Sequence, residues 1–521
     1  MELNLKNKKI GLWTATFIGI SSMIGSGWMF APLAAAQIAG GASIYAWVVG
    51  AFIIAVLGLA FSEVASLFPR RGISAIVGTI SHNRFFGFPF AIANWLGIVA
   101  VIALEATASV EYLVHIVPSI EHMLYTDGTL TIYGSLIVVC FIFVYALLNF
   151  WGMQLLARAN NYIVVFKLIV PLLTAILLMS SAFSVDNFTI EKDMFMPNGI
   201  SSVMTAVLTA GIIVAFNGFQ TIVSYASEIE NPHRTIPLSI VIAISFSLFV
   251  YLILQVAFIG AIPPEQLAQG YASVHFSAPM VQLTALVGLN FMALILYTDA
   301  IVSPMGTAIT FVGASTRMFT AMSRNHQVPS WFDHVDPVTN MSRRSLVANI
   351  IIAIIFVFSF SDWEKLATLV GVIHLLSYFV IPIALLVFRK NISIDQYTFR
   401  VPFGKIVAFF LFIFFNYLYT MAPFSVVLEI TFLLIIFQVL FIVIDAKTIG
   451  TYRDNIMMSI PVMLFIIGMA VINYISPHNK DIFSDVVFGG ILVVYTSVSL
   501  FVLSRVHNNE NIIAEFVSHK H

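Results

Sequence analysis

The chain has 521 residues, of which 60% are hydrophobic and 9% are charged, and its mean hydropathy is +0.98. Soluble domains carry roughly 25% charged residues, so the composition excludes an ordinary soluble protein and predicts a polytopic membrane protein. The net charge of -1 says little, because the positions of Lys and Arg relative to the bilayer matter more than their sum. The single cysteine, Cys140, excludes a disulfide framework and a cysteine-based metal site.

Apolar runs of roughly 20 residues, the length that crosses a bilayer, recur along the whole chain. The first run follows a short basic N-terminus and is too long for a signal peptide, so we take it as the first span. The polar connections are too short to fold as a soluble domain. We expect about 14 spanning helices, over residues 10–38, 42–67, 86–117, 130–150, 160–183, 200–226, 235–262, 281–314, 345–360, 364–388, 404–422, 424–444, 456–475 and 484–504.

The basic residues of the connections predict the orientation of the chain. Connections on the side opposite the N-terminus hold only Lys192, Lys365 and Lys480. Loops on the cytoplasmic side are enriched in Lys and Arg, so we expect a multi-pass protein of the cell (inner or plasma) membrane with both termini cytoplasmic. The residues on the expected cytoplasmic side are Lys6, Lys8, Lys9, Arg70, Arg71, Arg84, Arg158, Arg234, Arg317, Arg324, Arg343, Arg344, Arg389, Lys390, Arg400, Lys405, Lys447, Arg453, Arg505 and Lys520.

The middle of the first run, Ile-Ser-Ser-Met-Ile-Gly-Ser-Gly-Trp, is a poor helix. Gly25 and Gly27 lack a Cβ, and Ser22 and Ser26 can bond nearby backbone. Opened backbone at membrane depth is tolerated only where it lines a cavity or is buried in protein. We therefore predict half of a substrate site here, with the half-helix from Trp28 onward aiming its positive end at a carboxylate or similar anion. The alternative is a seam of small residues for close helix packing.

The sixth run contains Asn217-Gly218 about halfway across, flanked by Phe216 and Phe219. Asn-Gly favours turns, and buried polar groups need partners. Two interrupted helices in corresponding positions indicate an all-α, LeuT-like inverted repeat of five plus five spans. The expected segments are a cytoplasmic N-terminus at 1–9, a first repeat at 10–183, a second repeat at 200–388, additional C-terminal spans at 404–504 and a cytoplasmic tail at 505–521.

Several motifs give the chain a family resemblance. They are Gly25-Ser26-Gly27, Phe68-Pro69-Arg70-Arg71-Gly72, the Glu-Ile-Glu-Asn-Pro-His-Arg-Thr-Ile-Pro segment at 228–237, Ser315-Thr316-Arg317-Met318, and Arg-Asn-His-Gln-Val-Pro-Ser-Trp-Phe at 324–332. Together they resemble the amino acid-polyamine-organocation (APC) permeases over spans one to twelve. Ile24-Gly25-Ser26-Gly27-Trp28, Ala93-Asn94-Trp95 and the segment 105–109 are similar to the bacterial aspartate-proton symporters of that family. The resemblance implies proton-coupled symport of an amino acid, acidic ones such as aspartate or glutamate being favoured.

The two interruptions define the expected substrate site. Free N–H groups of the first break would hold the carboxylate of an amino acid, and carbonyl groups and side chains of the second would hold its ammonium. Trp28 is a candidate gate, and the two phenylalanines of the second break could stack on substrate, although plain core packing is an alternative for all three. The expected substrate-binding residues are Ser22, Met23, Ile24, Gly25, Ser26, Gly27, Phe216, Asn217, Gly218 and Phe219.

Ionisable groups inside the hydrocarbon region are costly unless they are paired or face a polar cavity. Lys167 in span five is the leading candidate for proton coupling, and snorkelling to the interface is its alternative. By resemblance, its position matches the lysine of proton-coupled members, whose ammonium takes the place of a sodium ion beside the unwound first helix. Asp299 in span eight is a candidate second proton carrier, paired with Lys167, or else a neutral acid that donates to a neighbouring helix. Glu105 in span three can sense the charge of a proton or substrate.

For four other polar residues of the spans, we expect a structural role and not a direct part in transport. Glu63 should pair with Arg70 or Arg71, and Glu111 should meet the outer vestibule or headgroups. For Glu429 we expect packing or an oligomer contact. His374 is expected to be a hydrogen-bonded polar group rather than a proton relay. The expectation for Glu63 follows from the resemblance, because it looks like the acid that this family often carries before its Pro-Arg loop, and that for Glu111 follows from its position near the outer end of its span.

Other functions remain open at this point. The chain lacks the GxxxxGK[ST] phosphate loop of a pump and the HExxH motif of a metalloprotease, so we expect no enzyme, no catalytic or metal-binding residues and no cofactor. The expected partners are an amino acid, protons and the bilayer, and no nucleic acid.

The charges at membrane depth bear on the substrate. One cation against several acids there would suit a neutral or cationic substrate. An acidic substrate requires Lys167 or free N–H groups for its second carboxylate, and protons on Glu105 or Asp299. The alternatives are a neutral or cationic amino acid or polyamine exchanger without proton coupling, a channel, and a transporter-like nutrient sensor.

Overall fold

The computed structural model describes residues 9–70, 72–126, 128–150, 153–188, 195–336, 341–360, 362–446, 451–480 and 482–506. Several predictions concern residues that lie outside these ranges. They are the terminal segments 1–8 and 507–521 and the residues Lys6, Lys8, Arg71, Lys192, Lys447 and Lys520.

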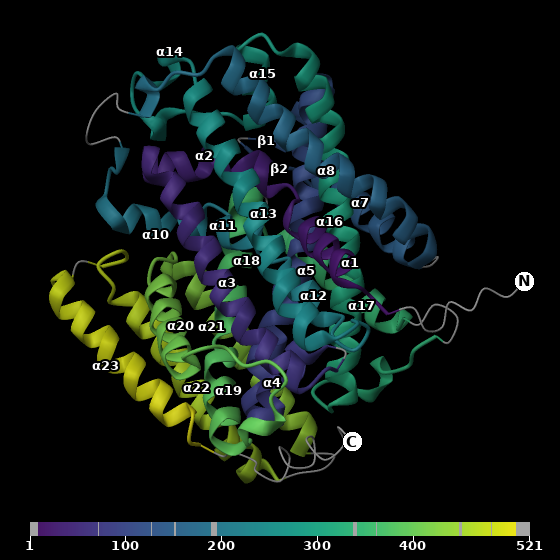
Figure 1. Ribbon diagram of the computed structural model, residues 1–521, viewed down its shortest axis with the longest axis vertical. Helices are drawn as coiled ribbons and strands as arrows, with labels where there is room; N and C mark the ends of the chain where they lie inside the picture. Colours follow the sequence, from purple (N-terminus) through teal and green to yellow (C-terminus); the bar gives the residue numbers. More distant parts are fainter. Residues whose placement is uncertain are drawn as a thin grey trace, which may run out of the picture.

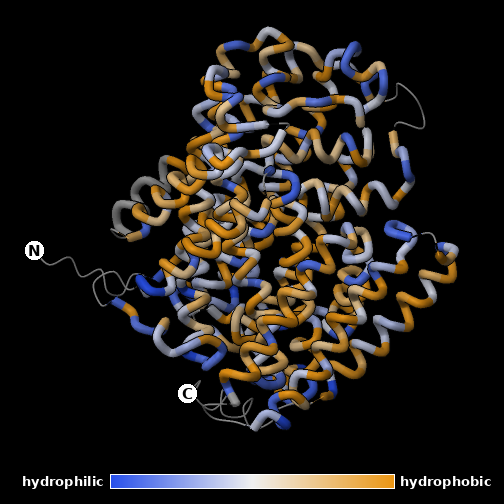
Figure 2. The backbone as a smooth tube through the Cα atoms, turned by 180° about the vertical axis from the view of Figure 1, so that it is seen from behind, coloured by the Kyte–Doolittle hydropathy of each residue, from blue (hydrophilic) through white to orange (hydrophobic). Residues whose placement is uncertain are grey.

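The prediction of an all-α membrane protein is confirmed. In the part of the chain that the structure describes, ten helical stretches are long and apolar enough to cross a membrane, and three shorter apolar helices accompany them. Figure 2 shows these helices as mostly hydrophobic, with hydrophilic segments frequent at their ends. The helix that is buried most completely is α5, which contacts α4, α16, α17 and α18.

The first half of the chain is almost entirely helical. Asn83 caps α5 by accepting hydrogen bonds from the N–H groups of Phe85 and Phe86, both at 2.9 Å. The elements are α1 Leu12–Met23, α2 Gly27–Ala39, η1 Gly40–Ala42, α3 Ser43–Leu67, α4 Ile73–Ser81, α5 Arg84–Ile116, η2 Pro118–Ile120, α6 Glu121–Leu124, α7 Ile132–Phe150, α8 Met153–Ser181 and η3 Asp186–Phe188, with an antiparallel hairpin of β1 Tyr125–Thr126 and β2 Thr129–Leu130.

The second half contains shorter pieces before its long helices. The expected span at 281–314 is wrong at its start, because a separate helix, α15, precedes α16 and the two meet at a turn with Gly288 at φ +83°. The elements are α10 Gly199–Thr209, α11 Ile212–Ala215, α12 Phe219–Ser224, α13 Pro232–Ala261, α14 Pro264–Leu267, η4 Tyr271–Ser273, α15 Pro279–Leu286, α16 Asn290–Arg324, η5 Ser330–Phe332, α17 Arg343–Ser359, α18 Trp363–Tyr378, α19 Val380–Asn391 and η6 Ile394–Gln396.

Four C-terminal helices lie together beside the core: α20 Gly404–Tyr419, α21 Phe424–Ala446, α22 Tyr452–Tyr474 and α23 Asp485–Leu503 (Figure 1). They contact α3, α5 and α19. Polar contacts fasten one end of this group. Arg84 forms an ion pair with Asp445 at 2.9 Å, and His82 Nε2 lies 2.7 Å from the carbonyl oxygen of Leu503. The C-terminal helices are therefore an attached layer, not a separate unit.

The first expected interruption is confirmed by the backbone. The helix α1 ends at Met23 and α2 begins at Gly27. Between them Ile24 is extended (φ -82°, ψ 91°), and the N–H of Gly25 bonds only two residues back, to the Met23 carbonyl at 3.1 Å. The chain therefore leaves the regular helical hydrogen-bond pattern where the sequence has its Gly-Ser-Gly segment.

The second interruption is longer than predicted. The turn at Asn217-Gly218 is present, but α10 already ends at Thr209, and Gly211 takes a left-handed conformation with φ +80°. Only glycine adopts such a backbone at low cost. A single helical turn, α11, separates the two breaks. The predicted single interruption at Asn217-Gly218 is therefore incomplete, because it missed Gly211.

The two interrupted helices pack against each other, and the short helices α11 and α12 of the second lie toward the middle of the molecule (Figure 1). The helix α1 packs against α12, and α2 packs against α10 and α11. Both interruptions are thus at a similar depth, which is the arrangement that a site between them requires.

The prediction for Glu63 is wrong in its partner. Its carboxylate accepts hydrogen bonds from Arg389 at 2.8 and 2.6 Å and from the Val401 N–H at 2.7 Å. The side chains of Glu63 and Arg389 are only 1% and 7% exposed. The C-terminal end of α19 packs along α3, so a distant arginine reaches the acid. Such bidentate contacts are the strong class of ion pair.

Candidate functional site

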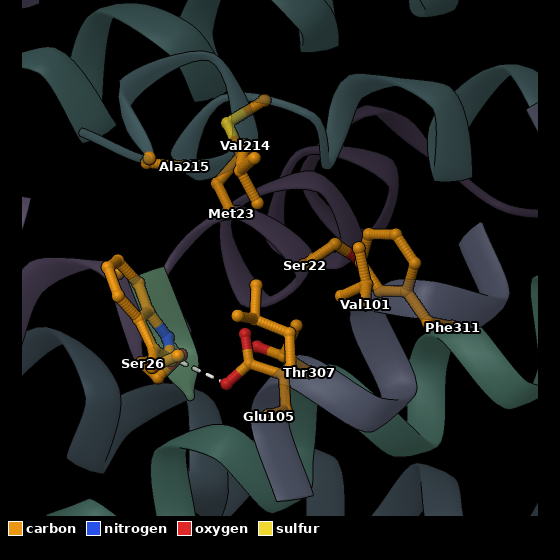
Figure 3. Close-up of a pocket in the computed structure, with 13 residues that line it drawn as sticks. Ser22, Met23, Ser26, Val101, Glu105, Val214, Ala215, Thr307 and Phe311 are labelled. Atoms are coloured by element: carbon orange, nitrogen blue, oxygen red, sulfur yellow. Dashed lines mark hydrogen bonds between the residues drawn. The ribbon is translucent and has the colours of Figure 1, made fainter. Parts of the chain in front are cut away.

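A small cavity lies between the interrupted helices, with a volume of about 10 Å³. This is about the space that one water molecule needs, so the site is closed around a volume much smaller than an amino acid. Figure 3 shows residues of α1, α5, α11 and α16 converging on it. Its lining residues are Ser22, Met23, Ser26, Gly27, Val101, Leu104, Glu105, Gly211, Val214, Ala215, Thr307, Phe311 and Trp363.

A carboxylate already occupies the start of the half-helix α2. The N–H of Ser26 donates to Glu105 Oε2 at 2.8 Å (Figure 3). The Ser26 hydroxyl accepts from Trp363 Nε1 at 3.0 Å. A Cβ at Gly25 would lie 2.3 Å from Glu105 Oε1, so the missing side chain is what lets the acid approach this backbone. The predicted anion-binding amide therefore binds an anion of the protein itself.

Lys167 fastens the broken end of α1. Its Nζ donates to the Ser21 carbonyl at 2.8 Å and to Thr307 Oγ1 at 2.7 Å. The Thr307 hydroxyl also lies within hydrogen-bond distance of the carbonyls of Ser21 and Ile24, at 3.2 and 3.3 Å. Lys167 is 0% exposed, which contradicts snorkelling to an interface. Its ammonium instead satisfies backbone that the interruption leaves without helical partners.

Asp299 is fully buried, and neither carboxylate oxygen makes a hydrogen bond of good geometry among the described residues, although the Trp28 side chain lies close enough to interact with it. The expected ion pair with Lys167 is absent from the described structure, although the two groups interact electrostatically. One turn further along α16, Ser303 Oγ donates to the Ile24 carbonyl at 3.4 Å. A buried carboxylate without a partner is costly in charged form. Asp299 is therefore placed where a proton or a cation would stabilise it.

The aromatic residues of the second interruption pack in the core. The Phe216 ring contacts Trp47 and Tyr251, with centroids 6.0 and 5.3 Å apart, and Phe219 contacts Tyr378 at 5.9 Å. Neither phenylalanine lines the cavity. In this conformation both rings pack in the core, as the alternative stated, and neither is placed to stack on a substrate in the cavity.

Asn217 anchors the second interruption to α18. Its Nδ2 donates to His374 Nε2 at 2.9 Å, and its Oδ1 accepts from Gln220 and Tyr378. His374 Nδ1 in turn lies 3.0 Å from the Val370 carbonyl. His374 is therefore a hydrogen-bonded polar group, as predicted. Asn217 holds the break in place from behind and does not face the cavity.

Other predicted residues fall outside the cavity lining. Ile24, Gly25 and Gly218 form the turns behind it, and a Cβ at Gly218 would lie 2.6 Å from the Met23 nitrogen. Trp28 is 0% exposed, and its Nε1 has no hydrogen-bond partner among the described residues. The gating role of Trp28 stays a prediction.

Two acids of the predicted spans, Glu111 and Glu429, lie outside the cavity. Glu111 lies at one end of α5 with Asp362 and Glu364 close enough to interact electrostatically. Its role at an outer vestibule stays a prediction. Glu429 is exposed on α21, which contradicts a packing role, and an oligomer contact stays a prediction.

Sequence reasoning missed several residues of the cavity. Thr307 could have been predicted from the sequence, because it follows Ser303 by one helical turn and Asp299 by two on the same face of α16. Gly211 could also have been predicted, because a glycine inside an apolar run often marks a break in a helix. Nothing in the sequence marks Val214, Ala215 or Trp363 as cavity residues, because only the packing of α11 and α18 brings them there.

The fold and the paired interruptions are those of a membrane transporter, and the family and relatives that the chain matches are transporters and not enzymes. The family model described as amino acid permease matches residues 10–444. The chain therefore belongs to the amino acid permease family of the APC superfamily, and the predicted family is confirmed.

Individual relatives agree with this assignment. The chain is 34% identical to the glutamate/serine transporter AimA of Bacillus subtilis (strain 168), over 96% of the chain and 93% of that protein. It is 31% identical to the aspartate-proton symporter of the same organism, over 74% of the chain and 73% of that protein. Among solved structures, the Eremococcus coleocola manganese transporter matches with a TM-score of 0.53 at 14% identity, covering 96% of the chain and 100% of that chain. This last likeness shows the LeuT-like fold alone.

Proposed function

We propose that this protein takes up an acidic amino acid, such as glutamate or aspartate, together with protons. The observation that carries the proposal is the Glu105 carboxylate on the Ser26 N–H, 2.8 Å away, in a cavity between the two interrupted helices. The names of two relatives, a glutamate/serine transporter and an aspartate-proton symporter, support the same substrate class.

The α-carboxylate of the substrate would take the position of Glu105. The start of α2 favours an anion, because its free N–H groups and its helix dipole both point there. The cavity holds only about 10 Å³, so Glu105 must withdraw before an amino acid can bind. A neutral acid binds the amide more weakly than a carboxylate does. A proton on Glu105 would therefore favour loading.

The ammonium of the substrate would face the second interruption. Gly211, Val214 and Ala215 line the cavity there, and the break around Gly211 frees carbonyl groups of the last turn of α10. Carbonyl oxygens at broken helices are suitable partners for a cation. This arrangement gives a zwitterion a negative and a positive partner on opposite walls.

Protons would be carried by Lys167, Glu105 and Asp299. Lys167 holds the end of α1 through the Ser21 carbonyl and links it to α16 through Thr307. Loss of its proton would weaken this fastening, so α1 could move relative to α8 and α16. Such movement of the interrupted helices against the surrounding helices is the usual route to alternating access.

Charge balance explains why protons matter for an acidic substrate. In the described core around the cavity, Glu105 and Asp299 are two acids facing one cation, Lys167. A substrate with net charge -1 would add to the excess, unless protons neutralise at least one of the acids. Without proton coupling, the same site would suit neutral or cationic substrates, which is the basis of the exchanger alternative.

Uptake into proteoliposomes tests the proposal. Labelled aspartate, glutamate, serine, leucine, arginine and GABA should be compared with and without an imposed pH gradient, acidic outside. We expect aspartate or glutamate to accumulate above equilibrium only with the gradient, and a protonophore to abolish the accumulation. Preferred uptake of arginine, or accumulation that is unchanged by the protonophore, would contradict the proposal. Binding without any flux would instead indicate a sensor.

A further inference from the structure

A second and much larger cavity, of about 510 Å³, lies toward the end of α16 that carries Arg317 and Arg324. Its volume is in the range of small-molecule sites. It shares no lining residue with the small cavity. The lining residues are Pro69, Arg70, Ile76, Ser227, Thr316, Arg317, Thr320, Ala321, Arg324, Asn325, Val335 and Met341. The high density of arginines places this face on the expected cytoplasmic side.

Three guanidinium groups line the cavity, and its described lining contains no carboxylate. Arg317 is held in position, because its Nη1 donates to the Tyr225 hydroxyl at 3.0 Å and its guanidinium lies 4.6 Å from the centre of the Tyr225 ring. Arg324 is exposed at the end of α16, and Arg70 is half-buried between α3 and α4. Arginines from two segments therefore converge on one hollow.

The rest of the lining is suited to a short carbon chain. Pro69, Ile76, Ala321, Val335 and Met341 are apolar, whereas Ser227 and Asn325 are polar. Guanidinium groups bind carboxylates through two parallel hydrogen bonds. Two or three arginines around an apolar wall therefore match a small molecule that has a carboxylate at each end.

The large cavity is close to the proposed substrate site. Phe311 lines the small cavity and Thr316 lines the large one, and both are on α16. Five residues of helix correspond to roughly 8 Å along its axis. An acidic amino acid that left the small cavity toward this side would reach the arginines next.

We propose that this cavity is an anion-binding site for small dicarboxylates on the cytoplasmic side, and that its occupation inhibits further uptake. The proposal rests on the proposed function, since it concerns the release side of that transport path. An anion held by these arginines would bridge α16 and the segment between α3 and α4, and it would lie in the way of a substrate that leaves toward this side. Rising internal dicarboxylate would then slow the carrier.

Succinate inside proteoliposomes tests the site, because it has two carboxylates but lacks the ammonium that the substrate site requires. Uptake of labelled aspartate should fall as internal succinate rises, whereas external succinate should have little effect. In Arg324→Gln, measured relative to the variant's own uptake without internal succinate, about tenfold more succinate should be needed for half inhibition, the loss expected for one hydrogen bond to a charged group. Arg317→Lys should weaken inhibition too, because lysine keeps the charge but loses the two-pronged geometry.

Arg344→Gln is the matched control. Arg344 is near the same end of the molecule and stacks on Trp331, but it does not line the cavity. This variant should be inhibited like the wild type. Equal inhibition of the wild type and Arg324→Gln, or no inhibition of an active wild type, would overturn the proposal. So would equal inhibition by acetate or inorganic phosphate.

Two further measurements separate the sources of failure. Inhibition that is present in vesicles of neutral lipid but absent with anionic lipid would assign the cavity to lipid headgroups and overturn the dicarboxylate proposal. If no variant transports any amino acid, the proposed function fails, and the cavity is then tested in detergent. Succinate should raise the thermal unfolding midpoint of the wild type more than that of Arg324→Gln, as a ligand of the folded state does. Equal shifts would refute the site.

Discussion

The two interrupted helices differ in what holds them. In the first, the opened backbone contacts ionisable side chains, with Glu105 on the Ser26 N–H and Lys167 on the Ser21 carbonyl. In the second, Asn217 holds the turn through neutral partners on α18. The first break is thus held by side chains that can exchange protons, and the second resembles a fixed support. The two interruptions looked equivalent in the sequence, but ionisable side chains hold the first and neutral hydrogen bonds hold the second.

The most severe change should be Lys167→Ala. Removing the ammonium leaves the Ser21 carbonyl with only the longer contact to Thr307 and removes the link from α8 to the end of α1, so we expect gradient-driven accumulation of amino acid to be abolished while some binding remains. Accumulation in proteoliposomes and binding in detergent measure the two effects. Lys365→Ala is the control, since that lysine pairs with Asp362 at 2.7 Å and is 62% exposed. Full accumulation by the Lys167 variant would remove this lysine from the mechanism.

The second largest effect should distinguish the glycines of the two breaks. A Cβ at Gly218 would lie 2.6 Å from the Met23 backbone nitrogen, whereas a Cβ at Gly25 meets the flexible end of Glu105. Backbone cannot yield as a side chain can, so Gly218→Ala should greatly reduce folded protein. Gly25→Ala should fold but transport at least several-fold more slowly.

Size-exclusion profiles and thermal unfolding of the two glycine variants provide the comparison. A Gly218→Ala protein as stable as the wild type would show that the turn is not tightly packed. A Gly25→Ala protein with normal uptake would show that Glu105 need not approach the α2 backbone.

Glu105→Gln should change pH dependence more than stability. Glutamine keeps the shape and can still accept from the Ser26 N–H, but it carries no charge and releases no proton. We expect uptake to persist at a reduced rate with a flatter dependence on external pH. Glu111→Gln on the same helix is the control, because Glu111 does not line the cavity. An unchanged pH profile for Glu105→Gln would exclude that acid from coupling.

The smallest effect on transport should come from Asn217→Ala. It leaves the polar atoms of His374, Gln220 and Tyr378 with one partner fewer, which should lower stability by about 1–3 kcal/mol. The apparent affinity for substrate should change little, because Asn217 does not line the cavity. Asn290→Ala, at the exposed start of α16, is the control. A large rise in KM with unchanged unfolding would instead place Asn217 in direct contact with substrate.

The features that depend on neighbouring residues could be predicted from the amino-acid sequence. Apolar runs gave the membrane class, the Gly-Ser-Gly segment gave the first interruption, and the motifs of the loops gave the family. The sequence also selected Lys167, Glu105 and Asp299, because ionisable groups at membrane depth are rare and costly. These signals are local, so they can be seen along one chain.

Contacts between groups that are distant in the sequence could not be predicted, because they depend on how the helices pack. Glu105 reaches a backbone amide 79 residues away, Lys167 reaches a carbonyl 146 residues away, and Glu63 pairs with Arg389 instead of the nearby loop arginines. The packing of α5, α8 and α19 around the interrupted helices sets these contacts. Hydrophobic length and helix propensity place a helix in the bilayer, but they do not fix its neighbours or its rotation, and those two choices decide which side chain lies opposite an open peptide group.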